Sequence, residues 1–120
     1  MKEGRVVLTE LRQADGHRKL RPSILLRQMS GYGDWLVCGL SSQLVQEVCG
    51  FDEQITPADD DFTESGLKRA SIIRLGYLQV VQLRDIAGEL GAISEERLNR
   101  LVARLTRYLE DHPLDDDIML

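Results

Sequence analysis

The pattern of apolar residues changes once along this chain, and that change limits the folds the chain can adopt. Between residues 4 and 83 the apolar residues form short runs rich in β-branched side chains, bounded by glycine or polar turn formers, as in strands. The runs are GRVVLTEL, PSILLRQM, WLVCGL, FDEQI and ASIIRLGYLQVVQL, the last of which breaks near Gly76 into two strands. They predict five or six short strands, the number expected of a small barrel.

Three details of this strand pattern are specific enough to test. Pro22 is predicted to open the second strand, where no ladder N–H is required. The continuous apolar run WLVCGL predicts burial on both faces. The stretch SSQLVQEV is either a helical turn capped by Ser41 or Ser42 or a loop, and TPADDDFTESG is predicted to be a loop.

The last apolar stretch has the period of a helix. Ser94 is the predicted N-cap, the acidic Glu95 and Glu96 suit the positive helix start, and His112–Pro113 is predicted to end the helix. The residues that recur at helical spacing are Leu98, Leu101, Val102, Leu105, Tyr108 and Leu109. The sequence therefore predicts a mainly β fold, a small barrel, with an amphipathic C-terminal helix.

Four arginines lie on the helix face opposite these apolar residues: Arg97, Arg100, Arg104 and Arg107. They form either a nucleic-acid ridge or a solvated face held by salt bridges. Acidic residues stand at helical pairing distance from Arg100 and Arg107, which favours the solvated face.

Size and charge restrict the classes of function. A chain of 120 residues that is 42% apolar can bury one core, so we expect one domain over residues 1–112, followed by an acidic tail at 113–120. No run is long enough for a membrane span and no secretory signal is evident, so we expect a cytoplasmic protein. The net charge of −5 argues against a surface coated by nucleic acid.

That net charge hides an asymmetry. Residues 1–30 hold seven Lys or Arg against three acidic residues, a balance of +4, so the remainder carries −9. A locally basic site on an acidic body is therefore predicted. Cys38 and Cys49 lack metal-ligand spacing and are predicted to be buried, reduced thiols, and the two histidines are far apart in sequence. We expect no metal site and no cofactor.

Cations and hydroxyls stand at the ends of two predicted strands. Arg21 precedes the second strand, and Ser41 and Ser42 follow the third, so adjacent strand ends of a barrel can bring them together. The guanidinium fork matches phosphate oxygens and a hydroxyl can donate to the same group, which suits a phosphodiester. The alternatives are a solvated charge for Arg21 and a helix cap for the serines.

Four stretches, in order, carry a resemblance to a known family: LRPSILL, CGLSSQ, SGLKRASIIRL and LGAISEERLNRLVARLTRYL. Over roughly residues 4 to 110 the chain resembles the MazF/PemK-like toxins of type II toxin–antitoxin systems. The resemblance implies an SH3-like barrel of the MazF/PemK/CcdB type, a homodimer, a cognate antitoxin, and metal-independent cleavage of single-stranded RNA through its own 2′-hydroxyl to a cyclic phosphate. Its catalytic residues would be Arg21 and, at the family's threonine position, Ser41.

Further residues are candidates for the same site. His17 is the candidate general base because it lies close in sequence to Arg21 and imidazole is the side chain that can exchange protons near neutral pH; the alternative is an ordinary loop histidine. The candidate RNA-binding residues are Arg18, Lys19, Ser42, Gln43 and Gln79.

The sequence also departs from the family. The loop before Arg21 lacks the family's glutamate, serine replaces threonine at Ser41, and Gln79–Val80 stands where the family has Arg-Thr. These losses keep two alternatives open: a non-enzymatic toxin that acts through protein contacts, as the related CcdB toxins do, and a housekeeping interaction domain. The acidic tail has the composition of a segment that could cover a basic site, the alternative being a disordered terminus.

Overall fold

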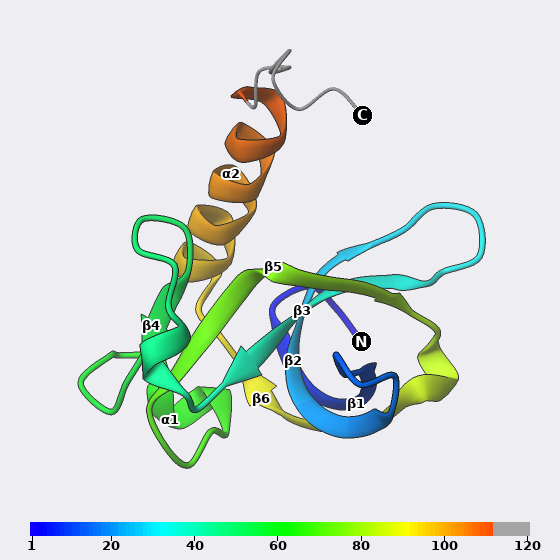
Figure 1. Cartoon of the computed structure of the whole chain (residues 1–120), viewed down its shortest axis with the longest axis horizontal. Helices are drawn as coiled ribbons and strands as arrows, with labels where there is room; N and C mark the ends of the chain where they lie inside the picture. The colour runs from blue at the N-terminus through cyan, green and yellow to red at the C-terminus, as the bar shows by residue number, and fades with distance from the viewer. Residues whose placement is uncertain (112–120) are drawn as a thin grey trace.

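The computed structural model describes residues 1–111, which form a curled antiparallel sheet with a helix against it (Figure 1). Within them, six strands follow the spatial order β4-β5-β3-β2-β1-β6. The strands are β1 (Arg5–Arg12), β2 (Arg18–Gln28), β3 (Trp35–Ser41), β4 (Glu53–Ile55), β5 (Ser71–Val81) and β6 (Ile86–Ala92). The helices are α1 (Phe62–Ser65) and α2 (Glu95–Asp111), and the 3-10 turns are η1 (Leu44–Gln46) and η2 (Leu83–Asp85). The prediction of a small barrel with a C-terminal helix is confirmed, and the barrel is a half-barrel with β4 and β6 at its edges.

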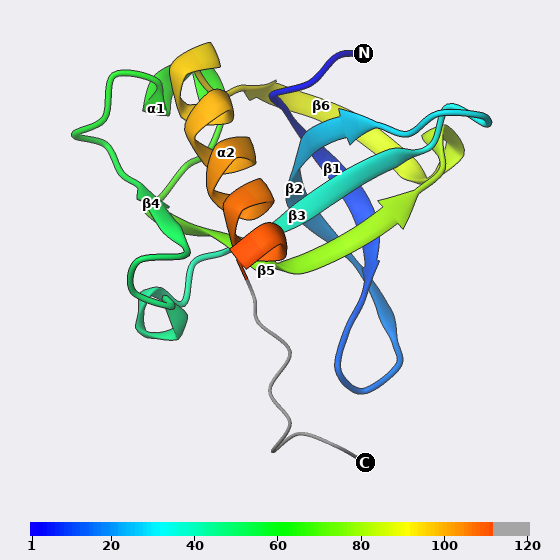
Figure 2. The same ribbon diagram turned by 90° about the horizontal axis from the view of Figure 1, so that it is seen from above.

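Both faces of the sheet bury apolar side chains. Because neighbours along a strand point to opposite faces, Val6 and Val7 belong to two separate clusters. The same holds for Val37 and Cys38 on β3, so the predicted burial of this strand on both faces is confirmed. One cluster includes Leu101 of α2, which lies near β4 and β5 (Figure 2).

A cluster of ion pairs fixes the start of α2. The guanidinium group of Arg97 is buried and donates to the carboxylates of Asp61 and Glu53 at 2.8 and 2.7 Å. Arg100 and Arg104 reach the same Glu53 carboxylate at 2.6 and 3.1 Å. The prediction of a solvated arginine face was therefore wrong for Arg97, because its partners come from β4 and the segment before α1, which helical spacing cannot reveal.

The predicted N-cap of α2 is confirmed. The Ser94 hydroxyl accepts the backbone N–H of Arg97 at 3.1 Å. The helix runs to Asp111, and the predicted stop at His112–Pro113 and the acidic tail at 113–120 lie outside the described residues.

Two strand predictions are corrected. Pairing with β1 already begins at Arg18, so Pro22 lies inside β2 rather than at its start. The strand tolerates this proline because β3 pairs with β2 only from the next residue onward. Strand β5 passes Gly76 without a break, and a register shift against β3 between Cys38 and Gly39 takes up the bend.

Strand β6 and α1 occupy stretches where no element was predicted. Strand β6 pairs with β1, and α1 packs against it. The approach is so close that a Cβ at Gly66 would overlap the carbonyl oxygen of Leu90, and one at Gly91 would overlap that of Glu64. Gly66 also has φ +75°, the left-handed conformation that ends α1.

The cysteines differ from the prediction in one respect. Cys38 is buried, and burial raises the pKa of its thiol to about 12. Cys49 is exposed, so its predicted burial was wrong; it lies just beyond η1, where the chain bulges outside the sheet. No helix in the described part of the chain is long and apolar enough to cross a membrane.

Candidate functional site

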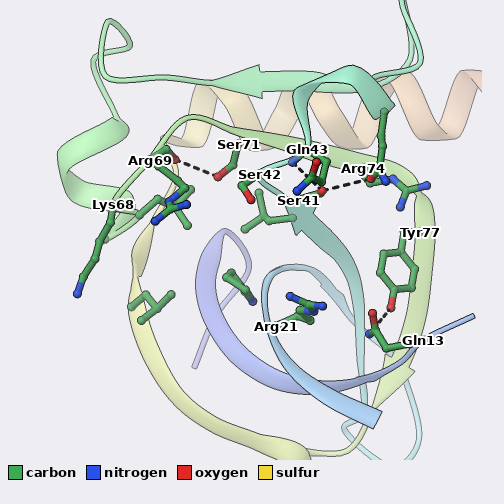
Figure 3. Close-up of a pocket in the computed structure, with 16 residues that line it drawn as sticks. Gln13, Arg21, Ser41, Ser42, Gln43, Lys68, Arg69, Ser71, Arg74 and Tyr77 are labelled. Carbon is green, nitrogen blue, oxygen red and sulfur yellow. Dashed lines mark hydrogen bonds between the residues drawn. The ribbon is translucent and has the colours of Figure 1, made fainter. Parts of the chain in front are cut away.

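A hollow of about 540 Å³ opens where β3 ends, and four cationic side chains line it (Figure 3). Arg21 comes from β2, Lys68 and Arg69 from the segment between α1 and β5, and Arg74 from β5. The other polar side chains on its lining are Gln13, Ser41, Ser42, Gln43, Gln46, Ser71 and Tyr77. Segments that are distant in sequence therefore gather positive charge at one place.

The hollow is cationic although the protein as a whole carries a charge of −5. Among the described residues that line it there is no Asp, Glu or His. Glu53 and Asp61 instead pair with arginines of α2. Uncompensated guanidinium and ammonium groups produce a local positive potential, so the hollow attracts anions.

Ser41 shapes the turn at the end of β3. Its hydroxyl accepts the backbone N–H of Gln43 at 3.1 Å and donates to Oε1 of Gln46 at 3.3 Å. A hydroxyl bonded to the N–H two residues on forms an ST-turn, which leads the chain from β3 into η1. Ser41 therefore does not cap η1, which was one of the alternatives for this stretch. Because its hydroxyl proton is donated to Gln46, a phosphate that binds this hydroxyl has to displace the Gln46 side chain.

The segment that carries Lys68 and Arg69 is held at both ends. The close contact of Gly66 with β6 fixes its start. At its end, the Ser71 hydroxyl donates to the Arg69 carbonyl oxygen at 3.0 Å. Two cations are thus presented from a constrained segment, which reduces the entropy lost when they bind an anion.

Tyr77 closes the opposite side of the hollow (Figure 3). Its hydroxyl donates to the Arg12 carbonyl oxygen at 2.8 Å and accepts from Nε2 of Gln13 at 3.0 Å. Its ring lies against Gly39, where a Cβ would stand 2.6 Å from a ring carbon. The guanidinium carbon of Arg74 lies 5.5 Å from the ring centre, within cation–π range.

The structure brings only part of the predicted set together. Four predicted residues line the hollow, namely Arg21, Ser41, Ser42 and Gln43. Arg18 and Lys19 do not line it; they belong to β2 rather than to a loop and pair with the end of β1. Gln79 lies in a neighbouring hollow, where its amide bonds both backbone groups of Arg12.

His17 also lies outside the hollow. Its ring is 80% exposed and stands 3.4 Å from the Asp15 carboxylate. Hydrogen bonds from the backbone and the ring of His17 lower the pKa of Asp15. This position supports the alternative of an ordinary loop histidine.

Sequence reasoning missed Lys68, Arg69, Arg74 and Tyr77. The sequence does contain a signal for the first two: Lys68 and Arg69 stand just before an apolar run, the same pattern that singles out Arg21. Arg74 and Tyr77 gave no such signal, because the register shift against β3 decides where their side chains lie. Among residues 1–111 no three or more His, Cys, Asp or Glu side chains are grouped as metal ligands.

The half-barrel with its C-terminal helix and a cationic hollow at the end of β3 define a small barrel protein that attracts anions. The chain belongs to the PemK-like, MazF-like toxins of type II toxin–antitoxin systems, whose family model matches residues 2–109. The family predicted from the sequence motifs is thereby confirmed, and a type II toxin has an antitoxin as its partner.

A solved structure shares this fold. The Mycobacterium tuberculosis toxin MazF-mt6 superimposes with a TM-score of 0.63 over 88% of this chain and 96% of that one. The two sequences are 14% identical, so the likeness concerns the fold alone. No curated protein sequence matches the chain.

Proposed function

We propose that the protein is a toxin that cleaves single-stranded RNA at the cationic hollow without a metal. The observation that carries this is the grouping of Arg21, Lys68, Arg69 and Arg74 around a hollow whose described lining contains no acidic side chain. Such a site attracts phosphate, and a phosphodiester is the phosphate that the toxin family's RNA substrate would supply.

The reaction we propose is an internal transesterification. The 2′-oxygen of the RNA attacks the adjacent phosphorus, the bond from phosphorus to the 5′-oxygen breaks, and a 2′,3′-cyclic phosphate and a 5′-hydroxyl result. Arg21 stabilises the charge that develops on the phosphate, and Ser41 orients it through its hydroxyl. A guanidinium is a poor general base because it stays protonated throughout the pH range in which proteins are folded.

Proton transfer in this proposal involves water rather than His17. The described lining offers no His, Asp or Glu to accept the proton of the 2′-hydroxyl. Water or hydroxide takes that proton, and water returns one to the leaving 5′-oxygen. The cleavage rate should therefore rise steadily from pH 6 to pH 9, without the bell shape that a paired acid and base produce.

The test is cleavage of a mixed-sequence single-stranded RNA by the purified protein. Cleavage should survive EDTA, yield cyclic phosphate ends, and fall about 100-fold or more in Arg21→Ala, because a group that stabilises transition-state charge is lost. The matched control is Arg27→Ala, an exposed arginine of the same strand that does not line the hollow. Intact RNA at a large excess of folded protein would overturn the proposal.

A non-enzymatic toxin that acts through protein contacts is the second candidate. Two observations favour it: the Ser41 hydroxyl is engaged in its turn, and both ends of the Gln79 amide are bonded to Arg12. Growth arrest that persists in Arg21→Ala cells with intact RNA would select this candidate.

The remaining features of the proposal come from family membership. We propose a cytoplasmic homodimer that a cognate antitoxin neutralises. Light scattering of the purified protein, alone and with the antitoxin, measures both associations.

A further inference from the structure

Strand β5 carries a bulge where it runs along β3. The neighbouring residues 38 and 39 of β3 pair with Leu78 and Arg74 of β5, so the three residues between these two have no partner on β3. A bulge bends its strand and redirects the side chains beside it. Here Arg74, just before the bulge, and Tyr77, its last residue, both line the cationic hollow.

A buried carboxylate holds the bulge in place. Asp52 is only 6% exposed, and its side chain accepts the backbone N–H of Leu75 in the bulge at 3.1 Å. Its other oxygen accepts the N–H of Val48, just beyond η1, at 2.9 Å. Because the N–H that the bulge removes from the ladder is bonded again, the bulge is a fixed feature that sets the position of Arg74.

Tyr77 gives Arg74 a rigid support. The ring packs against the buried cluster that includes Trp35, and its hydroxyl is hydrogen-bonded to Arg12 and Gln13. The guanidinium carbon of Arg74 lies 5.5 Å from the centre of that ring. Among residues 1–111 no carboxylate lies within ion-pair distance of Arg74. Its charge is therefore available to an anion in the hollow.

The register of the sheet places Arg74 and Arg21 on the two sides of Ser41. Strand β3, which carries Ser41, lies between β5 and β2. Gly39 pairs with Arg74 on one side and with Ser23 on the other. Because residues two apart on a strand share a face, Ser41 and Arg21 lie on the same face as Arg74. Figure 3 shows these three side chains around the hollow.

We propose that Arg74 is a second catalytic arginine, which binds the reacting phosphate from β5 while Arg21 binds it from β2, and that Tyr77 is its positioning residue. Negative charge on the phosphate oxygens grows as the 2′-oxygen adds to phosphorus, so both guanidinium groups bind the transition state more strongly than the substrate. The other two cations of the hollow, on the segment before β5, attract the RNA. This inference rests on the proposed function and adds a residue to its reaction.

The first test measures kcat and KM for cleavage of single-stranded RNA. In Arg74→Ala, kcat and kcat/KM should both fall about 100-fold, because an interaction made in the transition state is lost. Arg74→Lys, which keeps the charge but not the fork, should lose less. Added guanidinium, well below the concentration that unfolds the protein, should restore part of the activity of Arg74→Ala, which a structural role does not allow. The matched control is Arg84→Ala, an exposed arginine of η2 that does not line the hollow.

The second test concerns Tyr77. Tyr77→Phe keeps the ring but loses both hydrogen bonds that fix it, so kcat should fall about threefold or more. In the Arg74→Ala background this loss should vanish, because a positioning residue acts only through the residue that it positions. Tyr32→Phe, at a position between β2 and β3 that is 93% exposed, should leave kcat unchanged.

The outcomes separate this inference from the proposed function. If Arg21→Ala abolishes cleavage while Arg74→Ala keeps the wild-type kcat or changes only KM, Arg74 is not catalytic and the proposed function stands. If the wild-type protein leaves RNA intact, both are wrong. If Tyr77→Phe lowers kcat equally in both backgrounds, or not at all, Tyr77 does not position Arg74.

Discussion

Position 39 of β3 carries no side chain, and the ring of Tyr77 takes the space. A Cβ at Gly39 would lie 2.6 Å from a carbon of the Tyr77 ring. That ring cannot move freely, because the Tyr77 hydroxyl is hydrogen-bonded to Arg12 and Gln13. Gly39→Ala should therefore displace the ring and destabilise the protein by about 1–3 kcal/mol, the usual cost of overpacking. Urea unfolding measures the loss, and the proposed activity on RNA should fall with it because Tyr77 lines the cationic hollow.

Gly76→Ala is the matched control for this substitution. A Cβ there would meet only a ring carbon of Phe51 at 3.7 Å, an ordinary contact. Stability should stay within about 0.5 kcal/mol, the range of harmless surface changes. Equal losses in the two variants would show that Tyr77 is not packed against Gly39 as described.

At the residue scale, the sequence located polar side chains beside apolar runs but not the side chains whose positions depend on strand pairing. Arg21 and Ser41 were found because a cation or a hydroxyl beside an apolar run is visible in one dimension. Both side chains line the hollow because β2 and β3 are neighbours in the sheet. This pairing is expected, because consecutive short strands usually lie next to each other. Tyr77 and Arg74 depend on a register shift that no local pattern encodes.

Ion pairs tie the first turn of helix α2 to β4 and to the segment before α1, and Arg97 is the buried member of this cluster. Arg97→Ala would leave the buried Asp61 carboxylate without its guanidinium partner and remove one of the three arginines that pair with Glu53, and unfolding free energy should fall by about 3–5 kcal/mol. Urea titration at neutral pH measures this change. Arg107→Ala is the matched control on the same helix: its side chain is 84% exposed beside Asp111, so the change should stay below about 0.5 kcal/mol.

The same cluster makes stability depend on pH. Burial alone would raise the pKa of Glu53, but the hydrogen bond and charge of Arg100, with the charges of Arg97 and Arg104, outweigh it and lower that pKa below 4.5. Burial would likewise raise the pKa of Asp61, and Arg97 lowers it below 3.8. Below these ordinary values the unfolded chain binds more protons than the folded one, so stability falls as pH falls.

Unfolding free energy should accordingly be level near neutral pH and decrease below about pH 4.5. Glu53→Gln should lower stability at pH 7 and flatten the decrease, because the glutamine has no proton to take up. Glu10→Gln, at an exposed position of β1, should keep the wild-type profile. A decrease that is equally steep in Glu53→Gln would show that other carboxylates cause it.

Elements with a strong apolar period were predictable, and elements defined by their neighbours were not. The three central strands and α2 were found from alternation, apolar runs and helical spacing. Strand β6, with Gly88 and Gly91, has little strand propensity and exists because β1 pairs with it and α1 covers it. Gly91, one of the glycines that weaken the strand pattern of β6, is also the residue that permits the close contact with α1.

At the scale of the whole molecule, the proposed function requires an acidic protein to bind a polyanion through one cationic region. A net charge of −5 repels a polyanion at long range, while the cationic hollow attracts it at short range. RNA binding should therefore be confined to the hollow. Added salt should weaken this binding, because bound cations are released from the RNA when the protein neutralises its phosphates.

The salt dependence gives a count of the cations that take part. Each phosphate neutralised on a single strand contributes about −0.7 to the slope of log K against log salt, so contacts from the four cations of the hollow predict a slope between about −1 and −3. Arg69→Gln should reduce its magnitude by about 0.7, whereas Arg107→Gln, remote on α2, should leave it unchanged. Titration of 2′-fluoro RNA at several salt concentrations measures these slopes. An equal change in both variants would mean that RNA follows the arginines of α2 rather than the hollow, and the molecule would then bind RNA by a different face.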